Sequence, residues 1–424
     1  MEPTQQLDIR IQENLDNLNS FTENINCLYE TFEFSEITLR MQRQRAHSEF
    51  DSFCIQYKQE EDGQETIQLP RDKVREFLKL HKKKERAESA FNLIPRSYVV
   101  SLISLFDAFI GNIIKNIYNI CPEKLNNSEQ KLSFSELSHF NTLADAKDYI
   151  IDNKIEAILR SSHQEQFDWL AKELSISTLT KFKDWPNFIE ITQRRNLFVH
   201  TNGIVSNQYL TTCNKYKVDN IENINKGDKL NVDRAYFERT YEIFYEIGIK
   251  LSQMVLRCLL LKKEPNLLGQ IDSCLMTNIF DLITDKKYDI AIALSEFALS
   301  SNFKHKQVDR IYFLLNMAQS YKWKGENEKC LKLLKEEDSS AWSNELKMPK
   351  LVLEDNYEQA YLLMRSMGDN NEVLNKTTYR TWPIFQKIRE EKQFKEVFKE
   401  IFQEELIPQS AISSTEIKSE EITS

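Results

Sequence analysis

Glycine and proline are scarce in this sequence, with only 8 and 9 residues respectively in a chain of 424. Average proteins use considerably more of both, and these residues make many tight turns, helix breaks and phosphate-holding loops. Their scarcity favours long, uninterrupted helices. We therefore expect an all-α protein, and a chain of this length is sufficient for two or three domains.

Apolar periodicity predicts where most helices lie. Residues 7–32 carry one apolar stripe at steps of three and four, which predicts an amphipathic helix. A charged helix is expected over 71–92, and Pro95 is expected to begin a second, largely apolar helix that ends at Cys121-Pro122. Further helices are expected near 143–160, near 163–173, from Trp185-Pro186 to about Asn202-Gly203, and over about 232–262.

One segment near the N-terminus has the pattern of strands. Runs around residues 50–58 and 65–69 flank the turn signal Asp62-Gly63, which predicts a small β-hairpin. Pro265 interrupts the helical pattern later in the chain and marks the best domain boundary. The expected parts are residues 1–90 (helix, β-hairpin and basic helix), 91–262 (helical bundle), 266–406 (helical hairpin repeats) and 407–424 (disordered tail).

The third part has the spacing of a repeat protein. Ala318, Tyr321, Gly325, Cys330 and Leu334 are spaced like the small and aromatic residues of a tetratricopeptide repeat, which this segment resembles. No unit shows the whole pattern, so an ordinary helical hairpin domain is the alternative interpretation. Either interpretation predicts paired helices that present a surface to a partner.

Composition excludes several function classes. The net charge of −9 argues against a protein that coats nucleic acid non-specifically. The seven cysteines are scattered without CxxC spacing, which argues against disulfides and structural zinc and favours a reducing cytoplasm. No apolar run approaches the roughly 20 residues of a membrane helix. Nucleotide-binding and serine-hydrolase motifs are absent from the sequence. We expect no metal, no cofactor and no membrane partner.

The segment "FIEITQRRNLFVHTNGIV" gathers the polar side chains with the clearest chemical potential. Arg194 has a partner at Glu190 in the favourable i,i+4 orientation, whereas Arg195 has none at that spacing. Asn196 follows, and His200 is expected in the last helical turn, where the helix dipole favours imidazolium. The alternative interpretation is structural, with a terminal histidine that caps carbonyl groups.

This segment resembles the HEPN domains of prokaryotic defence and toxin proteins. "RRNLFVHTNGIVSNQYL" is similar to their basic-Asn-x-x-x-His signature, and "SYVVSLISLFDAFIGNIIKNI" to their central helix, whose acidic residue is here Asp107. "SSHQEQFDWLAKELSI" also resembles one subgroup of these proteins, and the resemblance covers about residues 90–260. It implies a HEPN-like helical bundle that often dimerises and a metal-independent endoribonuclease. The implied active-site residues are Arg195, Asn196 and His200, with Asp107 a weaker candidate.

The residue types suit this chemistry. A histidine near neutral pKa moves protons to and from reacting oxygens, and a guanidinium holds the phosphate oxygens on which charge develops. The amide of Asn196 is suited to orient the scissile group. Five helical steps, however, separate Arg195 from His200 by about 140° around the axis. The long side chain of Arg195, fraying of the helix end near Gly203 or a second subunit with its own motif would close this gap. Of these we expect a homodimer, because a two-fold axis brings both motifs into one cleft.

Two basic segments are candidates for contacts with the RNA backbone, namely "LRMQRQRAH" with Arg40, Arg43 and Arg45, and the helix over 71–92. Arg194 and a cluster in the helix over 71–92 are the predicted contacts, and that cluster comprises Lys82, Lys83, Lys84 and Arg86. The alternative is a solvated helix face. The remaining histidines (His47, His81, His139, His163 and His305) are isolated in the sequence and have no ligand spacing.

The sequence therefore predicts a cytoplasmic RNA endonuclease of a bacterial defence or toxin system. A protein partner or antitoxin is expected at the C-terminal repeats. The alternative is a non-catalytic HEPN-type scaffold or adaptor that binds a protein partner through these repeats. An enzyme needs Arg195 and His200 exposed in a cleft, whereas a scaffold tolerates burial of either.

Overall fold

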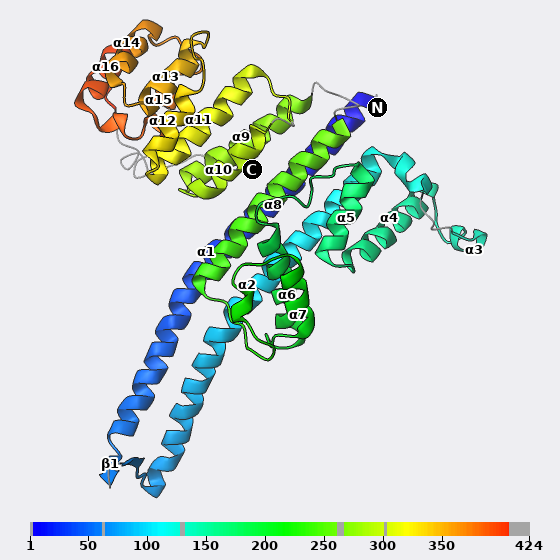
Figure 1. The fold of residues 1–424 in the computed structure, drawn as a ribbon, viewed down its shortest axis with the longest axis vertical. Coiled ribbons are helices and arrows are strands. Elements are labelled where there is room, and N and C mark those ends of the chain that lie inside the picture. Colours follow the sequence, from blue (N-terminus) through cyan, green and yellow to red (C-terminus); the bar gives the residue numbers. More distant parts are fainter. Residues whose placement is uncertain (1–2, 62–63, 128–131, 261–266, 301–302, 407–424) are drawn as a thin grey trace, which may run out of the picture. The chain divides into compact units, whose positions relative to one another are not determined.

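In the computed structural model, residues 3–61, 64–127, 132–260, 267–300 and 303–406 are described (Figure 1). These residues form helices and one two-stranded sheet, which confirms the all-α fold with a small β-hairpin. Contacts divide the chain into two compact units, residues 1–263 and 264–424. The boundary coincides with the segment around Pro265 at which the helical pattern is interrupted.

The first unit contains the elements up to residue 260. They are α1 (Pro3–Ile55), β1 (Lys58–Glu61), β2 (Gln64–Ile67), η1 (Arg71–Lys73), α2 (Val74–Ile120), η2 (Pro122–Asn127), α3 (Phe134–Leu137), α4 (Leu143–Leu159), α5 (His163–Leu174), α6 (Trp185–His200), α7 (Asn207–Lys215), η3 (Ile221–Asn223) and α8 (Arg234–Leu260). The ends of α4, α5, α6 and α8 lie within about two residues of the predicted ends.

Two helices are much longer than the sequence pattern predicts. α1 and α2 form a long antiparallel hairpin whose far end carries the small sheet (Figure 1). The expected break at Pro95 is absent, because α2 continues through this residue. Proline fixes φ at a helical value and removes only one hydrogen bond, and the apolar stripes of α1 and α2 pack against each other on both sides of it. Residues 1–90 therefore share one compact unit with the bundle.

The same packing shortens the first predicted strand. Phe53 is buried, and Phe50 contacts the ring of Phe77 across the hairpin, so residues 50–55 belong to α1. β1 begins only at Lys58, which pairs with Ile67 of β2. The predicted turn Asp62-Gly63 lies outside the described residues.

The core of the first unit is a packed group of α1, α2 and α8. The ring of Phe21 stacks on Phe109 with centroids 4.5 Å apart and also contacts Phe106. Gly248 lets α8 approach closely, because a Cβ there would lie 2.5 Å from Phe21 Cε1. Phe106 and Phe109 belong to α2, so this core packs directly against the helix that carries Asp107.

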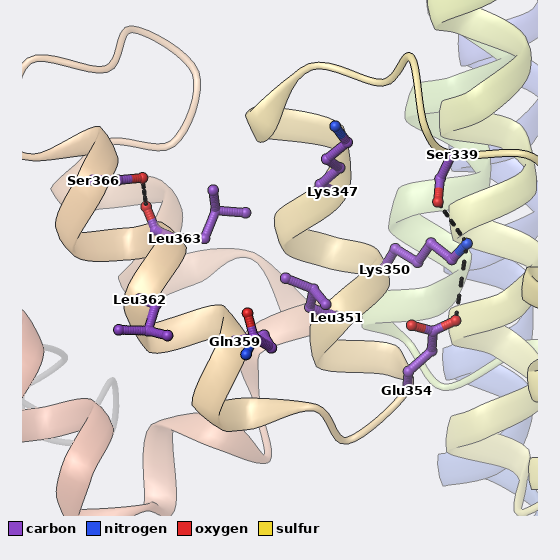
Figure 2. A pocket seen from close by; sticks show the side chains of 9 residues that line it. All are labelled: Ser339, Lys347, Lys350, Leu351, Glu354, Gln359, Leu362, Leu363 and Ser366. Atoms are coloured by element: carbon purple, nitrogen blue, oxygen red, sulfur yellow. Dashed lines mark hydrogen bonds and ion pairs between the residues drawn. The ribbon is translucent and has the colours of Figure 1, made fainter.

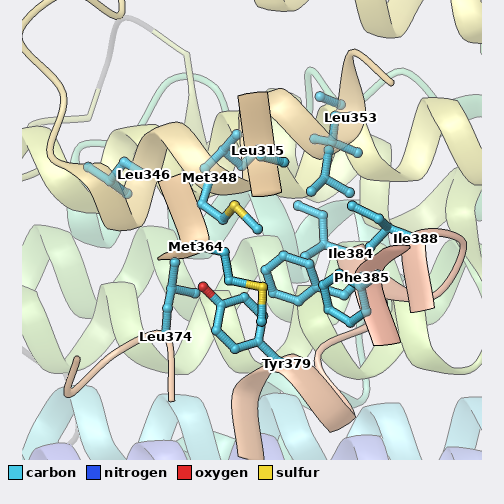
Figure 3. Packing of buried hydrophobic residues seen from close by; sticks show 14 of the residues in the cluster. Leu315, Leu346, Met348, Leu353, Met364, Leu374, Tyr379, Ile384, Phe385 and Ile388 are labelled. Atoms are coloured by element: carbon cyan, nitrogen blue, oxygen red, sulfur yellow. The ribbon is translucent and has the colours of Figure 1, made fainter. Parts of the chain in front are cut away.

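The second unit consists of helices from α9 onward. They are α9 (Leu268–Thr284), α10 (Tyr288–Ala298), α11 (Gln307–Lys324), α12 (Asn327–Lys335), α13 (Asn344–Leu353), α14 (Tyr357–Met367), α15 (Lys376–Thr381), η5 (Pro383–Phe385), η6 (Ile388–Glu390) and α16 (Lys392–Phe402). Figure 3 shows part of its core, where Met348 and Met364 meet Tyr379 and Phe385. The predicted disordered tail, 407–424, lies outside the described residues.

The repeat spacing corresponds to one helical hairpin in this unit. Gly325 caps α11 with φ of 91°, and the chain turns directly into α12. Ala318, Cys330 and Leu334 are buried between neighbouring helices, at the positions where the spacing predicts packing residues. The structure shows paired helices, and the tetratricopeptide assignment stays a prediction.

One helix meets the length and composition of a membrane span, contrary to the expectation that no segment approaches one. It lies within Arg71–Ile120, and 50% of its most apolar 18-residue stretch is buried inside the protein. A core helix of a soluble protein passes the same test, and this stretch packs against α1 and α8. None of the seven cysteines forms a disulfide.

Candidate active site

The helix with the predicted motif ends where the sequence indicates. α6 has Pro186 in its first turn and runs to His200, after which the amides of Thr201 and Gly203 both donate to Leu197 O at 2.9 Å. Asn202 and Gly203 have φ of 52° and 82°, in the left-handed region. A Cβ on Gly203 would lie 2.9 Å from Leu230 O, so glycine is required at this turn.

A buried carboxylate anchors this helix to its neighbours. Glu190 accepts hydrogen bonds from Arg194 Nε at 2.6 Å and from the hydroxyl groups of Tyr209 on α7 and Tyr236 on α8, the latter at 2.9 Å. Burial raises the pKa of Tyr209, and the charge of Glu190 raises it further. The cluster joins α6, α7 and α8 into one rigid support.

This cluster changes the interpretation of Arg194. Its side chain is only 14% exposed, and its guanidinium lies 4.0 Å from the centre of the Tyr236 ring. A guanidinium that is buried and paired with Glu190 is poorly placed to bind a phosphate. The structure thus gives Arg194 a structural role, in contrast to the predicted contact with RNA.

The loop after His200 is held by α2. Arg96, which is 5% exposed, donates from Nη1 to the carbonyl and side-chain oxygens of Asn202 at 3.0 Å, and from Nη2 to Asn231 Oδ1. Its Nε has no hydrogen-bond partner among the residues in the described ranges. Burial lowers the pKa of Arg96. This clamp gives the C-terminal end of α6 a defined position.

Arg195 meets an acidic residue from α2 and a histidine from α5. Arg195 Nη2 lies 3.8 Å from Asp107 Oδ2, and His163 Nε2 lies 2.9 Å from Asp107 Oδ1. Arg195 Nη1 also donates to Asn196 Oδ1 at 3.2 Å. The structure therefore brings together three of the predicted residues, Asp107, Arg195 and Asn196, and adds His163.

Three polar atoms in this cluster are buried without a hydrogen bond to any described residue. They are Asp107 Oδ1, His163 Nε2 and Arg195 Nε. Asp107 Oδ1 and His163 Nε2 are close enough to form an ion pair, but they are not oriented for a hydrogen bond. Buried polar atoms are nearly always paired in native proteins. Arg195 Nε, which has no described hydrogen-bond partner, is therefore the unusual atom of this site, while Asp107 Oδ1 and His163 Nε2 are paired by charge.

His163 is the residue that the sequence interpretation missed. Ser162 and Glu165 form a capping box, which makes His163 the first residue of α5. This box is visible in the sequence and fixes the position of the histidine on its helix. No local pattern indicates that Asp107, far away in the chain, faces it.

His200 stands apart from this cluster. Its side chain is exposed, and it makes no hydrogen bond or ion pair with the part of the chain that the structure describes. α6 is regular through His200, so the angle of about 140° from Arg195 persists, with a rise of about 7.5 Å. Fraying of the helix end does not close this angle.

The predicted basic cluster lies on the α1–α2 hairpin. Lys83 pairs with Glu49 of α1, and Lys84 lies 3.4 Å from Asp51. Lys82 and Arg86 are exposed. Along α2 the cluster is roughly 35 Å from Asp107 at 1.5 Å per residue. The two predicted groups are thus separate.

A groove extends from this hairpin toward the end of α6. Its volume is about 990 Å³, and its lining includes Arg43, Lys84, Arg96, Asn202 and Lys229. A smaller pocket of about 470 Å³ lies in the second unit, where Figure 2 shows Lys350 between Ser339 and Glu354. Neither pocket is lined by Asp107, Arg195 or His200.

Within the described ranges, no group of three or more His, Cys, Asp and Glu side chains is arranged to hold a metal ion. Comparison of the chain with protein-family models, with curated proteins and with solved structures finds no match.

Proposed function

We propose that this protein is a metal-independent endoribonuclease of the HEPN type, in which Arg195, Asn196, His200 and Asp107 act on the RNA. The observation that carries the proposal is the contrast between two adjacent arginines. Arg194 is buried and bound to Glu190. Arg195 is 27% exposed, and its Nη2 lies 3.8 Å from Oδ2 of Asp107. Arg195 thus keeps a charge that an anion can use, and His200, on another face of the same helix, is exposed.

The proposed reaction uses the hydroxyl group of the RNA itself. The 2′-oxygen attacks the adjacent phosphorus while a base takes its proton, and the bond from phosphorus to the 5′-oxygen breaks as an acid protonates that oxygen. Arg195 stabilises the charge that develops on the non-bridging oxygens, and Asn196 orients the phosphate. The products are a 2′,3′-cyclic phosphate and a free 5′-hydroxyl.

Incubation with total RNA tests this function. The purified protein is expected to cut RNA equally well with and without EDTA, because no step requires a metal ion, and to leave cyclic phosphate ends. Gel analysis and end-group determination measure both properties. Strict dependence on added Mg²⁺, or ends that carry a 5′-phosphate, would contradict the proposed mechanism.

A homodimer is part of this proposal. The angle between Arg195 and His200 prevents one straight helix from directing both at the same phosphate, and a second copy with two-fold symmetry supplies the missing group. Light scattering is expected to give about twice the chain mass of 50.2 kDa. Sulfate or RNA is expected to strengthen the dimer, because it relieves repulsion between facing arginines. A strictly monomeric protein that cuts RNA would contradict the dimer but not the nuclease.

The proposal extends to how RNA and partners bind. Lys82 and Arg86 are exposed on α2 and remain the proposed contacts with the RNA backbone, whereas Lys83 and Lys84 already have carboxylate neighbours. The second unit, built from paired helices, is the proposed site for a regulatory protein or antitoxin. The proposed setting is a bacterial defence or toxin system in the cytoplasm.

A further inference from the structure

We propose that His163, rather than His200 of the same chain, is the histidine that transfers a proton together with Arg195. This inference rests on the proposed ribonuclease function and names a second proton-transfer residue in that site. The central observation is geometric. Arg195 points away from His200 on the helix but shares the carboxylate of Asp107 with His163.

Three rigid elements place these groups together. Asp107 lies in the middle of α2, His163 begins α5, and Arg195 lies in α6. The imidazole of His163 is 11% exposed and packs against Phe106 and Phe188, with ring centroids 6.3 Å and 5.8 Å away. A histidine confined in this way has little freedom to turn from the site, and low solvent access strengthens its interaction with charges.

One buried donor at this place supports a ligand site. Arg195 Nε has no hydrogen-bond partner among the described residues, whereas Asp107 Oδ1 and His163 Nε2 face each other at 2.9 Å. A phosphodiester supplies acceptor oxygens for Arg195, and the neighbouring ribose supplies a hydroxyl group for the imidazole. An RNA backbone therefore matches the unpartnered donor of Arg195 and the adjacent imidazole.

Charged groups from two other helices lie beside the imidazole of His163. They are the carboxylate of Asp107 on α2 and, next to that carboxylate, the guanidinium of Arg195 on α6. On α5 itself, Glu165 accepts hydrogen bonds from the backbone and hydroxyl of Ser162. Asp107 therefore holds the imidazole in a defined position beside Arg195.

Two histidines then carry out the two proton transfers of the reaction. His163 accepts the proton of the 2′-hydroxyl as the bond from the 2′-oxygen to phosphorus forms. In the proposed homodimer, the protonated His200 of the second copy donates a proton to the departing 5′-oxygen. Exchange of protons with water restores both residues, so no oxidant, metal or other reactant is needed.

Replacement of His163 by Gln tests this role, because glutamine keeps hydrogen-bonding capacity but does not exchange a proton. His163→Gln is expected to lower the cleavage rate at least about 100-fold, with binding of a 2′-deoxy RNA analogue unchanged. His139→Gln is the matched control, because His139 is an exposed histidine of the same unit outside the site. It is expected to cut at the wild-type rate.

Chemical rescue separates proton transfer from a structural role. Free imidazole is expected to restore part of the activity of His163→Ala and none of the activity of Arg195→Ala. If His163→Gln cuts at the wild-type rate, or if His163→Ala is inactive and imidazole does not restore it, the assignment of His163 is wrong while the nuclease remains. A wild-type protein that cuts no RNA would overturn the ribonuclease and this assignment together.

Discussion

Replacing Arg195 with Ala is expected to lower the rate of RNA cleavage by about 100- to 1000-fold, the usual effect of removing one donor to a developing oxyanion. His200→Ala is expected to lower it by at least about 100-fold. His200→Ala should not shift the thermal midpoint measurably, because the His200 side chain is exposed. Cleavage assays and thermal melts on the same preparations measure both effects.

A matched control distinguishes this role from a general effect of charge. Arg160 is 80% exposed, pairs only with Glu156 on its own helix, and lies outside the site. Arg160→Ala should therefore leave cleavage unchanged. Arg195→Lys keeps the charge but loses the planar fork that binds two phosphate oxygens, so its activity should remain low. If Arg195→Ala cuts at the wild-type rate, the assignment of this arginine is wrong.

Replacing Glu190 with Ala is expected to lower the free energy of unfolding of the first unit by about 3–5 kcal/mol. The substitution leaves the buried guanidinium of Arg194 and the hydroxyl groups of Tyr209 and Tyr236 without their common acceptor. The loss is large because breaking a buried pair leaves an uncompensated charge. Urea denaturation, followed by circular dichroism at 25 °C, measures the change.

Glu156 provides the comparison for this prediction. It forms an i,i+4 pair with Arg160 at the surface and is 67% exposed, so Glu156→Ala should change stability by less than about 0.5 kcal/mol. An effect of Glu190→Ala as small as that of Glu156→Ala would show that the buried cluster does not stabilise α6. Activity of the Glu190 variant should fall in parallel with the folded fraction.

The middle helices were predictable because their signals are local. The helix containing the motif begins at Trp185-Pro186 and ends before Asn202-Gly203, and each boundary depends on residues within one turn. The capping box at Ser162 gives α5 the same kind of local signal. Where neighbouring residues determine the boundary, sequence and structure agree.

The lengths of α1 and α2 were not predictable in this way. Pro95 and the alternating pattern near residue 50 are both local signals for a break, and both are overridden. The reason is the contact between α1 and α2, in which Phe50 of α1 meets Phe77 before Pro95 and the buried residues of α2 continue from Pro95 onward. Packing energy of that kind has no signature in either segment alone.

The candidate site shows the same division. The pair of Glu190 and Arg194 was visible from its i,i+4 spacing, but its burial depends on Tyr209 and Tyr236, which come from other helices. His163 looked isolated for the same reason, because Asp107 reaches it only in the folded chain. The sequence predicts contacts within one helix from their spacing, but it does not predict which side chains of separate helices meet.

The central claim is that the 2′-hydroxyl of the RNA attacks the adjacent phosphorus, while Arg195 stabilises the charge on the non-bridging phosphate oxygens. The most direct measurement uses a short RNA with one cleaved bond and a matched RNA in which the nucleotide 5′ to that bond lacks the 2′-hydroxyl. The protein is expected to bind both equally and to leave the modified bond intact, while it cuts the unmodified RNA in EDTA. Cleavage of the modified bond at the wild-type rate would contradict the mechanism.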